Sequence, residues 1–266
     1  MANADSSSVL KKGIVLVDKP SGMTSFDVVF KACRILGASK GGHTGTLDPN
    51  VTGLMLIALE EARKAMPILF GMDKEYVGRM LLHSDVDKKT LEAAFKKFTG
   101  EITQKPPVKS RVARVERKRT VHSLKILKID GREVEFEVLC EAGTYIRKLV
   151  HDIGQSIASG AHMTWLRRTK IGPFSIAEAT PLSELSEKNV FPVEDALARI
   201  GLKKVFVKDD AIAKIRNGSP VFADFIIKRE NAGMDEPVGI FDKAGSIIAL
   251  GKNAADKIKT ERVFLL

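Results

Sequence analysis

A glycine-rich stretch holds the residues that are best arranged to do chemistry. It reads Gly42-His43-Thr44-Gly45-Thr46-Leu47-Asp48-Pro49. Its glycines permit a positive φ and a close approach of a ligand to the backbone, while Pro49 fixes its own φ and biases Asp48 toward extended geometry. A carboxylate on such a constrained turn suits a nucleophile or a general base that needs a fixed trajectory. His43 adds a flat ring that can stack on a ligand.

Two other interpretations of this stretch remain open on its residues alone. An Asp-Pro pair after a flexible loop is typical of a helix cap, which would give Asp48 a purely structural role. A phosphate-binding P-loop fits poorly, because no Gly-Lys-Ser or Gly-Lys-Thr ending follows.

Two polar residues farther along the chain are also candidates. Tyr76 falls in a predicted strand, where a tyrosine is most often a core residue whose hydroxyl is hydrogen-bonded. Arg147 falls in the first turn of a predicted helix, for which Thr144 is the expected cap. An arginine there can pair with a buried carboxylate, lower its pKa and keep it anionic. The alternative is an ordinary surface arginine.

Basic residues gather in two places. Residues 105–119 contain seven basic side chains and one acid, and Arg167, Arg168 and Lys170 form a second group. Each group is either a solvent-exposed basic surface or a set of side chains that contact phosphate. The histidines, cysteines and acids show no metal-ligand spacing, so we predict no metal site.

The hydrophobic pattern predicts strands and helices without a regular βαβ rhythm. Strands are expected over 14–17, 52–59, 75–82, 121–129 and 133–139, the last two joined at Asp130-Gly131. Helices are expected over 25–36, 60–69 and 89–98, and after Thr144. Short strands follow from about Gly201. This pattern favours an α+β fold with a mixed sheet over a doubly wound parallel sheet.

The composition favours a polyanionic partner. The chain has 266 residues with 43 Lys+Arg against 33 Asp+Glu, a net charge of +10. Such an excess suits nucleic acid or an anionic membrane surface, and a merely basic surface is the plain alternative. No apolar run reaches the roughly 18 residues that span a bilayer, and residues 1–9 lack a signal-peptide core. We therefore expect a cytoplasmic protein with no membrane partner, whose two cysteines are core residues.

Five short motifs follow one another in a characteristic order. They are Asp18-Lys19-Pro20-Ser21-Gly22-Met23-Thr24-Ser25, the stretch from Gly42 to Pro49, Lys74-Glu75-Tyr76-Val77, Gly143-Thr144-Tyr145-Ile146-Arg147 and Leu166-Arg167-Arg168-Thr169. With them the chain resembles the TruB/dyskerin family of RNA pseudouridine synthases from about Gly13 to Leu185. One match can arise by chance, whereas five in order are highly specific.

The resemblance implies an enzyme that isomerises a flipped-out uridine in structured RNA without a cofactor. Asp48 matches the catalytic aspartate, which attacks either C1′ of the ribose or C6 of the base. Tyr76 matches a tyrosine that packs on the base, and Arg147 matches the arginine that pairs with the aspartate. We expect further residues to contact the substrate or the RNA: His43, Thr44, Thr46, Lys19, Pro20, Leu166, Arg167, Arg168, Lys109 and Arg111.

The resemblance also implies a second domain and RNA partners. Residues 1–200 are expected to form the catalytic domain, and residues 201–266 a small β-barrel of the RNA-binding PUA type. From Lys74 onward the likeness is to the archaeal type, although Thr44 is typical of the bacterial tRNA enzyme. The substrate is then the T-loop uridine of tRNA, or sites in rRNA chosen by a box H/ACA guide RNA together with H/ACA core proteins.

Three rival functions compete with this interpretation. The chain could be a non-catalytic RNA-binding scaffold of an H/ACA-type particle, although the matches at Asp48, Tyr76 and Arg147 argue against it. A methyltransferase would need a glycine loop after a strand and an acidic residue beyond it, and the sequence has no such arrangement. A DNA-binding regulator is disfavoured because no helix-turn-helix stands out.

Overall fold

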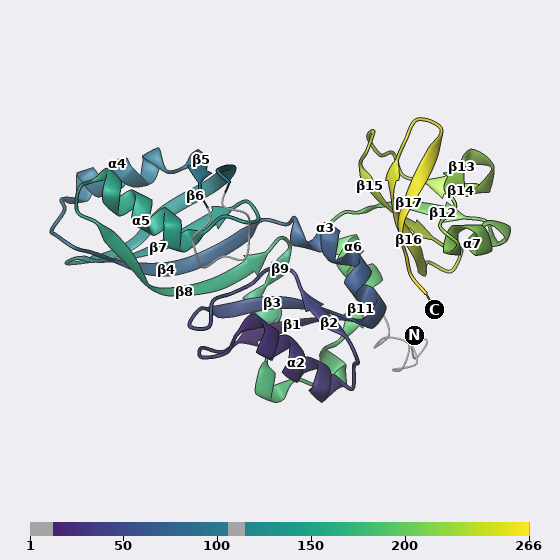
Figure 1. Ribbon diagram of the computed structural model, residues 1–266, viewed down its shortest axis with the longest axis horizontal. Coiled ribbons are helices and arrows are strands. Elements are labelled where there is room, and N and C mark those ends of the chain that lie inside the picture. Colours follow the sequence, from purple (N-terminus) through teal and green to yellow (C-terminus); the bar gives the residue numbers. More distant parts are fainter. Residues whose placement is uncertain (1–12, 106–114, 266) are drawn as a thin grey trace.

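The computed structural model describes residues 13–105 and 115–265, which form two β-sheets with helices packed against them (Figure 1). Lys109 and Arg111, both expected to contact RNA, lie outside the described residues. The strands of the first sheet are β1 Gly13–Lys19, β2 Gly41–His43, β3 Thr52–Leu59, β4 Lys74–Leu82, β5 Gly100–Gln104, β6 Arg117–Asp130, β7 Glu133–Cys140, β8 Ala161–Ile171, β9 Phe174–Ser175, β10 Thr180–Pro181 and β11 Phe191–Pro192. The α-helices among them are α2 Ser25–Leu36, α3 Met66–Phe70, α4 Lys88–Lys97, α5 Ile146–Ser156 and α6 Val193–Arg199.

The first sheet is mixed, as the α+β prediction requires. Its main order is β10-β1-β3-β8-β4-β7-β6-β5. Strands β1 and β3 are antiparallel, β3 and β8 are parallel, and β8, β4 and β7 are again antiparallel. The long strand β8 therefore joins the part of the sheet that carries the glycine-rich loop to the part that carries β4.

Local sequence signals account for most of these elements. Helix α2 begins with a capping box between Thr24 and Asp27 and ends at Gly37, which adopts a left-handed conformation. The hairpin of β6 and β7 turns at Gly131, whose φ is 56°. The predicted helix over 60–69 is instead a 3-10 helix, Glu60–Ala65, followed by α3.

The cap predicted for α5 is wrong. The N-cap residue of α5 is Tyr145, and it makes no side-chain capping hydrogen bond. The hydroxyl of Thr144 instead donates to the carbonyl of Glu141 at 2.8 Å. The helix after this loop thus begins one residue later than the sequence pattern indicated.

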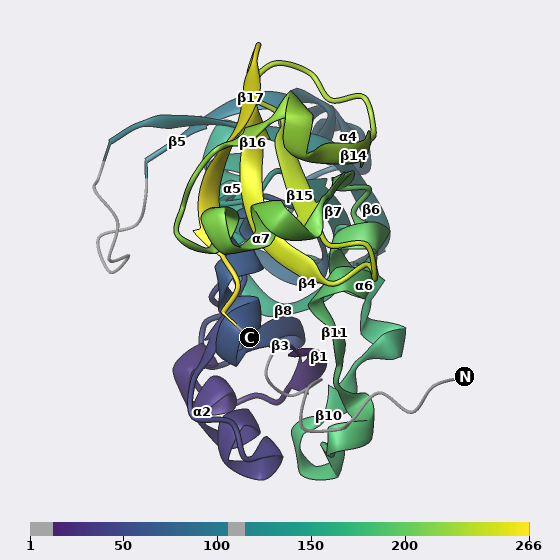
Figure 2. The same cartoon turned by 90° about the vertical axis from the view of Figure 1, so that its right-hand side faces the viewer.

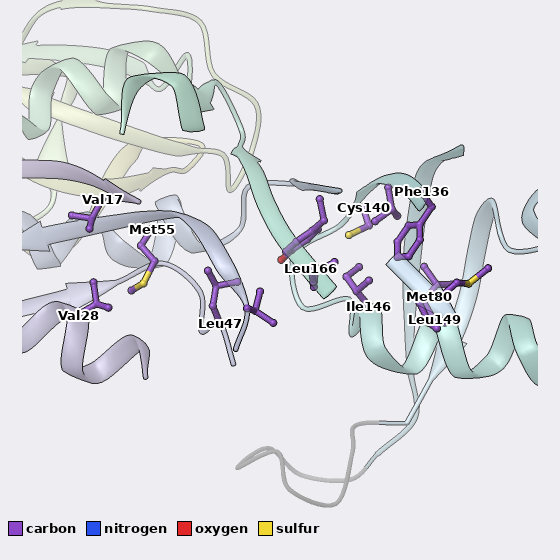
Figure 3. Close-up of a cluster of buried hydrophobic side chains, with 14 of the residues drawn as sticks. Val17, Val28, Leu47, Met55, Met80, Phe136, Cys140, Ile146, Leu149 and Leu166 are labelled. Carbon is purple, nitrogen blue, oxygen red and sulfur yellow. The ribbon is translucent and has the colours of Figure 1, made fainter. Parts of the chain in front are cut away.

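The main hydrophobic core lies between the first sheet and helices α2, α4 and α5. It joins side chains from both halves of the sheet. In Figure 3, Leu166 of β8 lies between a group that includes Val17 and Met55 and a group that includes Phe136 and Leu149. Both predicted core cysteines are buried, with Cys33 8% and Cys140 1% exposed.

The second sheet follows the first in the chain and forms a nearly closed, barrel-like unit (Figure 2). Its strands are β12 Lys203–Val207, β13 Val221–Phe222, β14 Ile226–Arg229, β15 Pro237–Phe241, β16 Ile247–Asn253 and β17 Lys257–Val263. The short strands expected after residue 201 are confirmed. Helix α7, Asp209–Arg216, was not expected.

A second hydrophobic cluster connects the two sheets. Ile14 and Leu16 of β1 belong to the same buried cluster as Phe241, Leu250 and Phe264 from the C-terminal region. The two sheets therefore share buried apolar surface, which removes it from water on both sides. Within the described residues, no helix has the length and apolar character needed to cross a membrane.

Candidate active site

Asp48 lies in the loop between β2 and β3, and its carboxylate pairs with the guanidinium of Arg147 in the first turn of α5. The two residues are 99 positions apart in the chain, so the pair exists only in the folded protein. Both side chains are about half exposed, at 51% and 55%. Asp48 is followed by a turn, in which the amide of Val51 donates to the carbonyl of Asp48 at 3.0 Å. Strand β3 begins directly after this turn. The helix-cap interpretation of Asp48 is therefore wrong, and the pair lies at the surface, open to a ligand.

Two buried cations hold the backbone of this loop before and after Asp48. Arg168 of β8 is 1% exposed, and it donates to the carbonyl of Gly45 at 3.0 Å and to that of Leu54 at 2.7 Å. Lys19, at the end of β1, is fully buried, and its Nζ donates to the carbonyl of Pro49 at 2.8 Å. The positions on either side of Asp48 are thus fixed by charge-assisted hydrogen bonds, which are stronger than neutral ones.

Helix α2 and the loop before it hold the residues next to Asp48. The Ser25 hydroxyl accepts from the amide of Leu47 at 2.8 Å and donates to its carbonyl at 3.0 Å. The amide of Gly22 donates to the carbonyl of Pro49 at 2.9 Å. The main-chain carbonyls of the loop therefore face inward, whereas the side chain of Asp48 faces outward.

Lys74, the first residue of β4, adds a third buried cation. It is 4% exposed, and its Nζ donates to the carbonyls of Phe70 at 2.7 Å and Met72 at 2.6 Å. Burial, together with the nearby charge of Arg168, lowers the pKa of Lys74 to about 8. Among the described residues, every buried charged side chain is a cation. The interior beneath the loop is therefore positive, which favours an anionic group at the surface above it.

His43 is held in its neutral form. Its Nδ1 accepts from the amide of Gly45 at 3.2 Å, so in the neutral ring the proton is on Nε2. Burial and the charge of Arg168 lower the pKa of His43 below its ordinary 6.5. In the same loop, Thr44 is buried at 1% exposure, whereas Thr46 is exposed.

Tyr76 lies in β4, opposite Arg168 in β8 and Val138 in β7. It is only 8% exposed. Burial raises the pKa of Tyr76, and the nearby charge of Arg168 opposes this rise only in part. Arg168 is thus the cross-strand neighbour of Tyr76 and also donates to the carbonyl of Gly45, so the predicted base-packing residue and the predicted catalytic loop are both next to this arginine.

Leu166 owes its position to a glycine. It pairs with Gly78 across β8 and β4 and is 6% exposed. A Cβ atom at Gly78 would lie 2.9 Å from Leu166 and 2.6 Å from Phe136, closer than real contacts allow. The missing side chain of Gly78 thus lets Leu166 lie against the strand that carries Tyr76.

Arg167 points away from this group. Successive side chains of a strand alternate between the two faces of the sheet, so Arg167 and Arg168 face opposite ways. Arg167 donates to the carboxylate of Asp18 at 2.7 Å and contacts the hydroxyl of Thr52 at 3.4 Å. Together with the exposed Pro20 it lines a pocket of about 560 Å³. Two of the residues expected to contact RNA, Pro20 and Arg167, therefore line this pocket, whereas Arg168 contacts the loop of Asp48.

Sequence reasoning missed two supports of the site. From the sequence, Ser25 is an ordinary residue of the first helical turn, and Lys74 is the residue before a predicted strand. The available signal is that both fall inside the ordered motifs. In residues 13–105 and 115–265, no three His, Cys, Asp or Glu side chains are grouped as metal ligands.

Two family models match consecutive parts of the chain. Residues 33–146 match the N-terminal domain of TruB family pseudouridylate synthases, and residues 147–205 match the tRNA pseudouridylate synthase B C-terminal domain. Asp48 and Tyr76 fall within the first match, and Arg147 begins the second. The fold and these matches define the chain as a pseudouridine synthase.

Curated relatives agree over nearly the whole chain. Probable tRNA pseudouridine synthase B of Methanococcus maripaludis is 41% identical over 97% of this chain and 83% of its own length. The protein of the same description from Methanopyrus kandleri is 42% identical over 91% of this chain and 76% of its own length. The chain belongs to the TruB family of pseudouridylate synthases, which are isomerases.

Two solved structures superimpose on nearly the whole chain. A chain of a Cbf5-Nop10-Gar1 complex superimposes with a TM-score of 0.88 at 36% identity, over 98% of this chain and 88% of that one. A chain of an H/ACA RNP bound to a substrate RNA containing 2′-deoxyuridine gives a TM-score of 0.86 at 34% identity, over 99% and 88%. Both matches include the two sheets.

Proposed function

We propose that this pseudouridine synthase acts on a uridine of tRNA, with Asp48 as its catalytic group. The observation that carries the proposal is the Asp48–Arg147 pair on a loop that buried cations hold in place. The choice of tRNA rests on the relatives, which are described as probable tRNA pseudouridine synthases B.

The arrangement supports specific roles for three side chains. Asp48, as a carboxylate, attacks either C1′ of the ribose or C6 of the flipped-out base. The N-glycosidic bond breaks, the uracil turns, C5 bonds to C1′, and the bond formed by Asp48 breaks again to return the free carboxylate. C5 loses its proton, and N1 takes one up. Arg147 orients the carboxylate through a charge-assisted hydrogen bond, and Tyr76 packs on the base and assists removal of the C5 proton. Extruding the uridine costs a few kcal/mol, which stacking and pocket contacts offset.

The contacts with the rest of the RNA are proposed on charge and exposure. Thr46 is exposed beside Asp48, His43 offers a neutral ring for stacking, and Leu166 an apolar wall. Lys109 and Arg111 are assigned to the RNA backbone because the net charge of +10 favours phosphate. Lys19, Pro20, Thr44 and Arg168 act by supporting the loop. Arg167, on the other face, contacts RNA outside the reaction site.

The second sheet is proposed to be a PUA-like RNA-binding domain of residues 201–266, after a catalytic domain of residues 1–200. Its nearly closed form supports this assignment. Buried side chains common to both sheets would keep the two RNA surfaces in a fixed relation. We place the enzyme in the cytoplasm, with its tRNA substrate.

A second candidate function is guide-directed modification. The likeness to chains of a Cbf5-Nop10-Gar1 complex and of a substrate-bound H/ACA RNP favours it. In that case a box H/ACA guide RNA chooses the uridine, in rRNA for example, and H/ACA core proteins complete the particle.

Tritium release from C5-labelled uridine in a tRNA transcript tests both candidates. Purified protein alone should release tritium, and Asp48→Asn should abolish the release while the protein remains folded. Release that requires added guide RNA and H/ACA core proteins would favour the second candidate. A wild-type protein that binds RNA but releases no tritium under any of these conditions would be a scaffold.

A further inference from the structure

Gln104 is a buried amide that the roles above do not use. It is the last residue of β5, paired with Arg117 of β6, and is only 3% exposed. Its Oε1 accepts from the amide of Tyr145 at 2.9 Å, and its Nε2 donates to the carbonyl of Tyr145 at 3.2 Å. One side chain 41 positions away thus holds both main-chain polar groups of one residue.

Tyr145 is the residue at which the helix with Arg147 begins. Helices α2 and α4 have their own side-chain caps at Thr24 and Asp87, whereas Tyr145 provides none for α5. The Tyr145 carbonyl also accepts from the amide of Leu149 at 3.0 Å, which closes the first turn of the helix. Gln104 therefore fixes the N-cap residue of α5 to a strand of the sheet.

Arg147 lies two residues after Tyr145, in the first turn of α5. Its side chain is 55% exposed, so little side-chain packing holds it over Asp48, and its position follows from the backbone of the first turn. That backbone is fixed by the neighbouring buried Ile146, at 4% exposure, and by Gln104 through Tyr145. A shift at Tyr145 moves the guanidinium relative to the carboxylate.

We propose that Gln104 is a positioning residue, which sets the first turn of α5 and thereby places Arg147 on Asp48. This proposal rests on the proposed function, because it assigns Gln104 a role in that same pair. Gln104 does not touch the substrate and acts through Arg147 alone.

The test uses single-turnover tritium release from the C5-labelled tRNA transcript, with enzyme in excess, and separate measurement of RNA affinity. Gln104→Met keeps the volume of the side chain and removes both hydrogen bonds. It should slow the reaction by about 10-fold or more, since small misplacements of catalytic groups are costly, and leave RNA affinity within about 2-fold. In an Arg147→Lys background, the same change should slow the reaction by less than about 2-fold, because residues that act as one unit are not additive.

Gln104→Glu supplies a second variant and a pH readout. The carboxylate accepts from the Tyr145 amide but cannot donate to its carbonyl, whereas the protonated carboxyl can do both. Burial raises the pKa of a carboxyl group. The rate of Gln104→Glu relative to wild type should therefore rise as the pH is lowered. Even if Gln104→Met does not fold, this ratio decides the question.

Val134→Ala is the matched control for lost stability. Val134 is fully buried and pairs with Met80 near the far end of β4. This variant should melt at a lower temperature and keep the wild-type rate.

Two results would overturn the positioning role. One is a Gln104→Met rate equal to that of wild type. The other is a rate loss from Gln104→Met that is as large in the Arg147→Lys background as in the wild-type background. If Asp48→Asn reacts normally, the proposed function itself fails; if Asp48→Asn is inactive while Gln104→Met is normal, only the role of Gln104 fails.

Discussion

His43 shows how one hydrogen bond sets a protonation state. Its Nδ1 accepts from the amide of Gly45, which only the neutral ring can do, and its pKa lies below the ordinary 6.5. Between the folded pKa and 6.5, the unfolded chain binds more protons than the folded protein. Stability from His43 is therefore present above this window and is lost as the pH falls through it.

We predict that His43→Gln removes part of the acid sensitivity of the fold. The free energy of unfolding in urea, measured from about pH 7 down to about pH 5, should fall less steeply for His43→Gln than for wild type. Equal slopes for His43→Gln and wild type would contradict the assignment.

Arg168→Lys tests the support of the catalytic loop. A single ammonium cannot reproduce the fork by which Arg168 reaches the carbonyls of Gly45 and Leu54. We expect a loss of about 2 kcal/mol in the free energy of unfolding, because a buried carbonyl is left unpaired. The single-turnover rate should fall as well, since Gly45 lies in the same loop as Asp48. Urea titration and tritium release measure the two effects, and an unchanged rate would show that the loop keeps its form without this contact.

Among single residues, the motifs located the reacting side chains and the supporting Lys19, but not every support of the site. Asp48 and Arg147 were predicted as a pair, and they contact each other. The holding role of Ser25 was not predictable, because it depends on which face of α2 meets the loop. The same holds for Lys74, whose partners are main-chain carbonyls that carry no sequence signal.

The capping box of α2 links an element to the site. Thr24 accepts from the amide of Asp27, and the next residue, Ser25, binds both polar groups of Leu47. We predict that Thr24→Ala lowers the free energy of unfolding by about 1 kcal/mol and also slows the reaction, because fraying of α2 releases Ser25. Urea titration and single-turnover tritium release provide the two measurements.

The cap of α4 offers the matched control for this prediction. Asp87 accepts from the amide of Thr90, and α4 packs against β6 and α5. Asp87→Ala should lower stability and keep the wild-type rate. If both cap variants slow the reaction equally, the effect of Thr24→Ala reflects stability alone.

Helices with local caps were the elements that the sequence predicted well. The bounds of α2 and α4 agree with the expected ranges to within one residue, because their start signals lie in the chain itself. The start of α5 was misplaced, since the side chain that binds its N-cap residue comes from β5. Propensity and spacing do not report such long-range hydrogen bonds.

The shared hydrophobic cluster makes a prediction for the whole molecule. Phe264 is fully buried in the cluster that also contains Ile14 and Leu16. Phe264→Ala should cost about 3–5 kcal/mol, and because the cluster spans both sheets, wild type and variant should each unfold in one cooperative transition. Calorimetry tests this. Two separate transitions in the wild type would contradict the coupling of the sheets.

The sequence predicted a larger mixed sheet followed by a smaller β-rich region, whereas it did not predict the contact between them. Alternating apolar residues identify strands that are buried on one or both faces. They do not say which strands meet, and the cluster of Phe241 and Leu250 with β1 side chains joins opposite ends of the chain. Which strands meet is therefore known only from the folded structure.

The loop of Asp48 is held through the carbonyl oxygens of Gly45, Leu47 and Pro49, and such contacts do not read side-chain identity. The side chain of Thr46, exposed between them, therefore takes no part in the contacts that hold the loop. Position 46 is accordingly a natural entry point for directed evolution: a randomised library there would sample new substrate preferences while the scaffold beneath it stays intact.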